Sequence, residues 1–131
     1  MENEQPKEQK VEIQKETAEE RPEEKIDYDT FSKVNLQTAT ILEAERVPNS
    51  DKLLKMTIDL GYEKRQLVAG IAESYSPEEA IGKQIVIVAN LKPRRIRGVE
   101  SNGMLLAVQG EDKKIILLTP EKKSENGLRV Q

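Results

Sequence analysis

The sequence predicts an all-β domain with one short helix, preceded by a polar tail. From residue 34 onward, segments rich in Ile, Leu, Val and Thr alternate with short turns, which is typical of β-strands. The one helical segment with clear start and stop signals lies between the third and fourth of these strands. The first 26 residues have too few apolar side chains to form part of a core.

Residues 1–26 have the composition of a disordered acidic tail or linker. They contain nine acids and five bases, and substantially apolar residues occur at five positions: Met1, Val11, Ile13, Ala18 and Ile26. Such a segment cannot bury enough surface to offset the entropy lost on ordering. Residues 27–131 carry 16 bases and 15 acids, so the acidity of the chain belongs to the tail and the domain itself is nearly neutral.

The first half of the domain predicts a helical turn and three strands. "DYDTFSK" at 27–33 predicts a helical turn that begins at Asp27 or Asp29, with Tyr28 and Phe31 on one face. Strand-like sequence follows, interrupted by the turns "PNSD" and "GYEK". The middle strand, "KLLKMTIDL", shows the cleanest alternation: one face is apolar and the other polar. The predicted strands are 34–47, 52–60 and 65–71.

The second half predicts a helix and three further strands. In "SYSPEEAIGKQ", Ser76 and Glu79 have the spacing of a capping box, Pro77 suits the first helical position, and Gly82 ends the helix. The strands "QIVIVANL" and "MLLAV" are apolar on both faces, and Asn102-Gly103 predicts a turn between them. "KKIILLTP" predicts one more strand before a polar C-terminal end.

This order of elements is that of a five-stranded Greek-key barrel of the OB type, with the short helix between strands 3 and 4. A small sandwich is the competing architecture, but the single helix in that place favours the barrel. Strands apolar on both faces need a second covering layer outside the barrel. We therefore expect C-terminal additions at the interface of a homodimer.

Composition excludes most catalytic chemistry. The chain has neither His nor Cys, which excludes a Ser-His-Asp triad, a Cys nucleophile and the usual zinc sites. Its carboxylates are scattered, and no Gly-rich phosphate loop occurs. We expect no catalytic residues, no metal and no cofactor. Without a signal sequence or an apolar run of spanning length, the sequence predicts a cytoplasmic protein.

The segment after the fourth strand is the candidate binding site. "NLKPRRIRGVESNGM" places Lys92, Arg94, Arg95 and Arg97 within six residues. OB-folds bind oligonucleotides with the loop between strands 4 and 5 and with strands 2 and 3. Cations there would neutralise phosphates. A solvated, functionless loop is the alternative, since charge runs usually are solvated.

Further candidates surround this segment. Lys55, Lys64 and Arg65 belong to the second and third strands, on the face that leads to the loop. Ser101 can bind phosphate or ribose and Met104 can pack on a base, although a turn-stabilising hydroxyl and a core side chain are the simpler interpretations. No aromatic residue is interleaved with the cations, which favours a folded RNA over an unstructured strand.

The motifs "SDKLLK", "VAGI", "NLKPR" and "RGVESNGM", in this order, resemble the tRNA-binding domain family over residues 27–131. This family includes the C-terminal domain of methionyl-tRNA synthetases and stand-alone structure-specific tRNA-binding proteins. The resemblance implies an OB-fold that binds the outside of tRNA and forms a homodimer through its C-terminal segment. The implied tRNA contacts are Asn90, Lys92, Arg94, Arg95, Arg97, Ser101 and Met104.

One position departs from the family pattern. Gln37 stands where the family often has Arg, so a contact from that position is not expected. The tail would be a linker from a synthetase catalytic domain. Two alternatives remain: a chaperone of the CsaA type, which shares the domain and binds peptides, and a protein scaffold that uses the acidic tail as its contact.

Overall fold

The computed structural model describes residues 23–131, so most of the tail predicted to be disordered lies outside the described residues. The chain divides into two units, one ending at Phe31 and the other running Ser32–Gln131. Helix α2 (Tyr28–Ser32), which ends one residue past this division, confirms the predicted helical turn. The Asp27 carboxylate accepts a hydrogen bond from the Thr30 N–H at 2.8 Å. This bond holds the pKa of Asp27 below its ordinary value.

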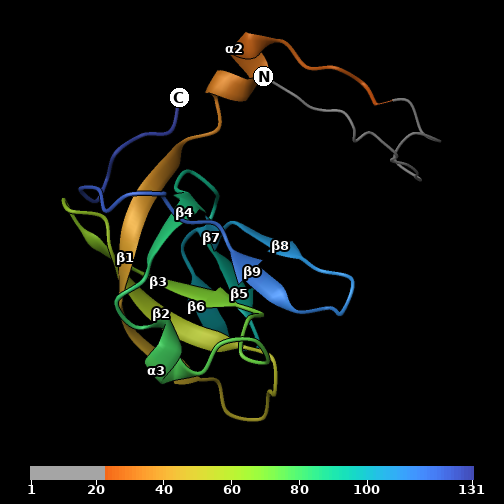
Figure 1. Cartoon of the computed structure of the whole chain (residues 1–131), viewed down its shortest axis with the longest axis vertical. Coiled ribbons are helices and arrows are strands. Elements are labelled where there is room, and N and C mark those ends of the chain that lie inside the picture. Colours follow the sequence, from red (N-terminus) through yellow and green to blue (C-terminus); the bar gives the residue numbers. More distant parts are fainter. Residues whose placement is uncertain (1–22) are drawn as a thin grey trace, which may run out of the picture. The chain divides into compact units, whose positions relative to one another are not determined.

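The second unit is built on a five-stranded antiparallel sheet (Figure 1). The strands lie in the order β3-β2-β1-β4-β7. Their bounds are β1 Leu36–Arg46, β2 Leu54–Asp59, β3 Lys64–Ala69, β4 Gln84–Val88 and β7 Met104–Leu105. The long strand β1 pairs with β4 through its first half and with β2 through its second half, and the register shifts between Ile41 and Glu43.

The core lies inside the curl of this sheet. The alternation predicted for the second strand is confirmed, because Leu54, Met56, Ile58 and Leu60 are all fully buried. Ile85 and Ile87 of β4 join the same cluster. Burial of each such side chain stabilises the fold by about 1.5–3 kcal/mol. Strand β4 also buries Val88 on its other face, so its two-sided apolar pattern reflects real burial.

Helix α3 (Pro77–Ala80) lies between β3 and β4 and has the predicted capping box. The Ser76 hydroxyl accepts a hydrogen bond from the Glu79 N–H at 3.1 Å, and the Glu79 carboxylate accepts one from the Ser76 N–H at 2.8 Å. Ala80 is the buried residue of the helix. Gly82 follows with φ of +92°, a conformation that glycine adopts without strain.

Two predicted elements differ from the structure. The basic segment, predicted as a loop, contains a hairpin of β5 (Arg94–Ile96) and β6 (Val99–Ser101). The predicted last barrel strand is divided: β7 pairs with β4, whereas β8 (Ala107–Gln109) pairs with β9 (Ile115–Leu117). Asn102-Gly103 therefore links the first hairpin to β7 and does not close a hairpin of its own. The hairpin is local, but its Arg97-Gly98 turn is a weak signal in the sequence. The end of β7 depends on pairing with β4, far back along the chain, which local periodicity cannot report.

The sheet curls until its edge strand β3 meets the link between β6 and β7. The Asn102 N–H donates to the Gln66 carbonyl at 2.8 Å, and the Val68 N–H donates to the Ser101 hydroxyl at 3.0 Å. This closure is consistent with a barrel. The C-terminal segment runs along the first half of β1, on the edge that does not pair with β4, and there Gly127 and Val130 donate backbone hydrogen bonds to the Thr38 and Leu36 carbonyls.

The residues that the structure describes include no helix long and apolar enough to cross a membrane.

Candidate nucleic-acid interface

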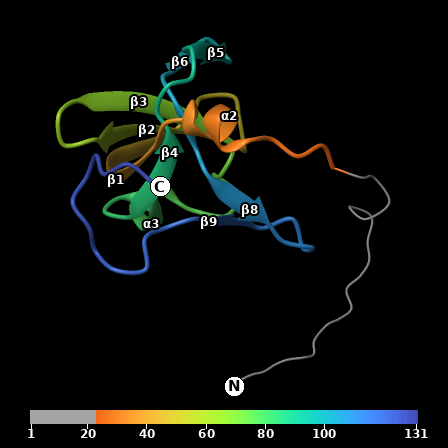
Figure 2. The same cartoon turned by 90° about the horizontal axis from the view of Figure 1, so that it is seen from above.

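The β5–β6 hairpin projects from the sheet and carries three of the four predicted cations (Figure 2). Arg97 and Gly98 form its turn with φ of +53° and +78°. Two successive positive φ values are the mark of a type I′ turn, whose twist matches that of paired strands. The segment is therefore an ordered arm, and the hairpin fixes the backbone positions from which its Arg side chains extend.

The hairpin register sorts its side chains onto two faces. Arg95 lies opposite Glu100, and Arg94 lies opposite Ser101. Cross-strand partners point to the same side of a hairpin. Ser101 is 2% exposed where it meets β3, whereas its partner Arg94 is exposed, as are Arg95 and Glu100.

The predicted cations differ in how they are engaged. Arg95 donates to the Gly98 carbonyl at 3.0 Å and Arg97 to the Asn49 carbonyl at 3.3 Å, both at the surface. No hydrogen bond or ion pair within residues 23–131 engages the side chains of Lys64, Lys92 or Arg94. Unpaired exposed cations are free to bind phosphate oxygens.

Two cations of β2 and β3 already have partners. Lys55 forms an ion pair with Glu45 at 2.8 Å, and both side chains are partly exposed. Arg65 pairs with Glu63 and also donates to the Ala89 carbonyl, with its side chain 15% exposed. The ion pair with Glu45 offsets the positive charge of Lys55. The two contacts of Arg65 restrict the movement of its guanidinium group.

Asn90 and Ser101 hold the chain in position. The Asn90 amide accepts from the Asn35 N–H at 2.9 Å and donates to the Lys33 carbonyl at 2.7 Å. The buried Ser101 hydroxyl accepts from Val68 and donates to the Gly103 carbonyl at 3.1 Å. Met104, by contrast, is 43% exposed on β7, opposite Val88.

The hairpin base and β3 together form a hollow that sequence reasoning missed. It has a volume of about 270 Å³ and is lined by Lys64, Arg65, Gln66, Glu100 and Asn102. The sequence did not mark Gln66 or Asn102 as binding residues, since single amide side chains in a strand and a turn are common. Glu100 is the one acid of the basic segment, a contrast that was visible in the sequence.

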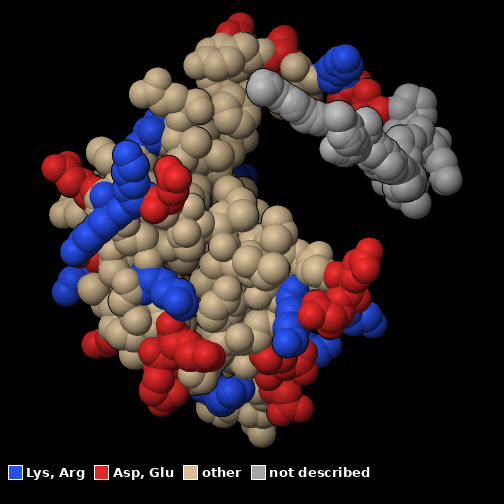
Figure 3. All heavy atoms as spheres, in the orientation of Figure 1, with Lys and Arg blue, Asp and Glu red and all other residues tan. Residues whose placement is uncertain are grey.

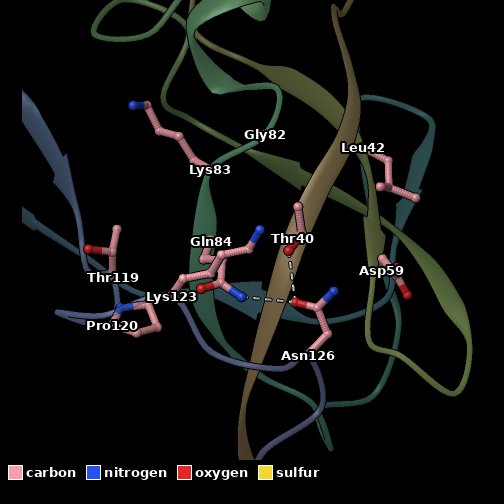
Figure 4. Close-up of a pocket in the computed structure, with 10 residues that line it drawn as sticks. All are labelled: Thr40, Leu42, Asp59, Gly82, Lys83, Gln84, Thr119, Pro120, Lys123 and Asn126. Carbon is pink, nitrogen blue, oxygen red and sulfur yellow. Dashed lines mark hydrogen bonds between the residues drawn. The ribbon is translucent and has the colours of Figure 1, made fainter.

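A larger hollow, of about 630 Å³, lies where the C-terminal segment meets β1 and β4 (Figure 4). The side-chain oxygen Oδ1 of Asn126 accepts hydrogen bonds there from the Thr40 hydroxyl at 2.8 Å and from the Gln84 side-chain amide at 3.3 Å. These bonds attach the C-terminal segment to the sheet, and they account for the polar lining. The described residues hold no cluster of three or more acidic side chains suited to a metal ion.

Comparisons with known proteins identify the family of this chain. The chain belongs to the family described as putative tRNA binding domain, whose model matches residues 36–129. It is 58% identical over 105 residues to the methionine–tRNA ligase of Thermotoga maritima, a match that covers 80% of this chain and 16% of the ligase. The chain thus spans about a sixth of the length of that relative.

Solved structures show the same fold. A MetRS-related protein from Pyrococcus horikoshii aligns with a TM-score of 0.78 and 38% identity, over 83% of this chain and 100% of that one. The chaperone CsaA from Bacillus anthracis aligns with a TM-score of 0.75 and 30% identity, over 82% and 100%. The resemblance found in the sequence motifs is therefore confirmed.

Proposed function

We propose that this chain is a non-catalytic module that binds tRNA through the β5–β6 hairpin. The observation that carries the proposal is an ordered, projecting arm whose exposed cations include Arg94, with no acidic partner in the described chain. Phosphate contacts of this kind dominate the affinity of nucleic-acid binding. We propose tRNA as the ligand because the chain belongs to the putative tRNA binding domain family.

The proposed framework is an OB-fold barrel over residues 27–131. Strands β1, β2, β3, β4 and β7 would be its five barrel strands, with α3 between the third and fourth. The hydrogen bonds from Asn102 and Val68 that join β3 to the β6–β7 link support closure. The hairpin then occupies the connection between barrel strands 4 and 5, where OB-folds meet nucleic acid. Residues 1–26 would be the linker between this barrel and a synthetase catalytic domain.

Direct contacts are proposed for a subset of the predicted residues. Lys64, Lys92, Arg94, Arg95 and Arg97 would bind phosphates, and the exposed Met104 would pack on a base. Asn90 and Ser101 would act by positioning, because their polar groups already have internal partners. Lys55 would contribute little while paired with Glu45. The basic segment has no aromatic side chain, so recognition would depend on shape.

The proposed homodimer would form through the β8–β9 hairpin. Val108 and Ile116 lie opposite each other there, and they are 49% and 53% exposed. Leu118, just beyond β9, is also exposed. Adjacent exposed apolar side chains of this kind mark interaction surfaces. On the face drawn in Figure 3, charged side chains gather toward the margins and uncharged ones fill the middle.

We also propose that the module acts in the cytoplasm as the C-terminal part, or a partner, of methionyl-tRNA synthetase. The similarity to methionine–tRNA ligases supports this assignment. A tethered tRNA-binding module would raise the local tRNA concentration near the catalytic domain. A dimeric chaperone of the CsaA type is the second candidate, supported by the structural similarity to CsaA and by the exposed apolar residues of β8 and β9.

A binding titration distinguishes these functions. The chain is titrated with folded tRNA, the same tRNA after denaturation, duplex DNA and an unfolded polypeptide, each at several salt concentrations. We expect preference for folded tRNA and an affinity that falls as salt rises. Equal affinity for the three nucleic acids would contradict shape recognition, and preference for the polypeptide would favour the chaperone.

A variant pair locates the site. Replacing Arg94 and Arg95 by Ala should weaken tRNA binding and reduce the salt slope by roughly two, about one for each lost phosphate contact. The matched control replaces Lys122 and Lys123, which lie outside the hairpin, and should leave most of the slope in place. Equal effects of the two pairs would show that binding follows net charge alone.

A further inference from the structure

We propose that the hollow between β3 and the β5–β6 hairpin binds one unpaired guanine of the RNA, with the Glu100 carboxylate accepting hydrogen bonds from its Watson–Crick edge. This inference rests on the proposed function and adds a base-specific contact to it. The hollow is lined by Lys64, Arg65, Gln66, Glu100 and Asn102.

Glu100 is unusual because it places an acid on a surface suited to phosphates. It is exposed, and it is the one acid among residues 90–103. Arg95 lies opposite it on the hairpin, yet no ion pair to Glu100 is formed within the described chain. A role in stabilising the hairpin by charge pairing therefore does not explain it. A carboxylate here would repel phosphate, but it would attract N–H donors.

The floor of the hollow is fixed by hydrogen bonds. The Gln66 amide donates to the Glu100 carbonyl at 2.8 Å, and the Asn102 N–H donates to the Gln66 carbonyl at 2.8 Å. The Asn102 side-chain amide has no partner within residues 23–131. The ordered backbone lowers the entropy cost of binding, and the Asn102 amide is free to bond to a ligand.

Arg65 lines one side of the hollow, and its side chain is 15% exposed. Glu63 and the Ala89 carbonyl hold its guanidinium group from two sides. Unpaired RNA bases stack on aromatic side chains or on Arg guanidinium planes. Because the basic segment lacks aromatic residues, the base would pack against the exposed part of Arg65.

The size and donor pattern select the base. A volume of about 270 Å³ lies just below the ~300–1,000 Å³ typical of small-molecule pockets, which suits a single base better than a larger ligand. Guanine presents two adjacent N–H donors, N1 and N2, which match the two oxygens of a carboxylate, and an O6 acceptor beside them for the Asn102 amide. The other three bases place an acceptor next to each Watson–Crick donor, which the carboxylate would repel.

The variant Glu100→Gln tests the proposal, because the guanine contact and simple phosphate binding predict opposite changes in tRNA affinity. It removes a negative charge from a cation-rich surface, so a site that binds only phosphates would bind tRNA more tightly. If Glu100 accepts from guanine, the variant should instead bind folded tRNA about tenfold more weakly. Glu78→Gln, at an exposed position of α3, is the control with the same change of charge, and it should not weaken binding.

Chemical protection identifies the base. Kethoxal reacts with N1 and N2 of unpaired guanines, so the wild-type chain should protect one unpaired guanine that Glu100→Gln leaves reactive. Tighter or unchanged binding of Glu100→Gln, or equal protection by both proteins, would overturn the guanine contact while leaving tRNA binding intact. Failure of the wild-type chain to bind tRNA would overturn the proposed function and this inference together.

Discussion

At the residue scale, Ser101 shows how a predicted ligand group can prove to be a structural one. Its hydroxyl accepts from the Val68 N–H in a buried position, where β3 meets the hairpin base. Ser101→Ala would leave that N–H without an acceptor, so we expect a loss of about 1–3 kcal/mol in unfolding free energy, measured by urea denaturation. Ser50→Ala removes an exposed hydroxyl and should cost less than about 0.5 kcal/mol. Equal losses would contradict the closing role of Ser101.

Gly127 fixes the C-terminal segment against the sheet. It has φ of +83°, its N–H donates to the Thr38 carbonyl at 2.7 Å, and an added Cβ would collide with the Leu60 carbonyl oxygen. Gly127→Ala should therefore destabilise the fold by about 2–4 kcal/mol in the same urea experiment. Gly98→Ala is the control, because φ is also positive but nothing lies within 4 Å. It should cost only about 1–2 kcal/mol.

At the scale of elements, the sequence predicted what local chemistry determines. The alternation of Leu54, Met56 and Ile58 located β2, and the Ser76–Glu79 spacing located α3. The hairpin was missed because Arg97-Gly98 is a weaker turn signal than Asn-Gly, although Arg97 adopts a positive φ. The split after β7 depends on pairing with β4 and β9, which no local window contains.

For the candidate site, too, the sequence predicts some features and not others. Its charges are properties of composition, so Lys92 and Arg94 could be chosen from the sequence alone. Whether a side chain is free of hydrogen bonds and ion pairs depends on its neighbours in the folded domain. The sequence could not show that Glu45 pairs with Lys55, that the Ala89 carbonyl binds Arg65, or that the Asn90 side chain both accepts and donates a hydrogen bond within the domain.

The capping box of α3 allows an element-scale test. Ser76→Ala removes the acceptor of the Glu79 N–H, and loss of an N-cap side chain costs about 0.5–2 kcal/mol. We expect a decrease of that size in thermal or urea stability. Glu79→Gln keeps an acceptor for the Ser76 N–H and should change stability by only a few tenths of a kcal/mol. A larger loss for Glu79→Gln would show that its charge near the helix start matters more than the box.

At the scale of the whole molecule, the remaining question is what covers the β8–β9 hairpin. Val108 and Ile116 would be buried in the proposed homodimer, and an ammonium group buried at an interface without a partner is costly. Sedimentation of the wild-type chain should therefore give twice the chain mass of 14.8 kDa, whereas the double variant V108K/I116K should sediment as a monomer. Ile81→Lys is the control, because Ile81 is exposed to a similar degree but lies beside α3, outside the hairpin, and the dimer should persist. A monomeric wild-type chain, or a dimer that survives both lysines, would exclude this face as the interface. Because the variants leave the β5–β6 hairpin intact, tRNA titration of the monomer would then measure how much of the affinity depends on dimerisation.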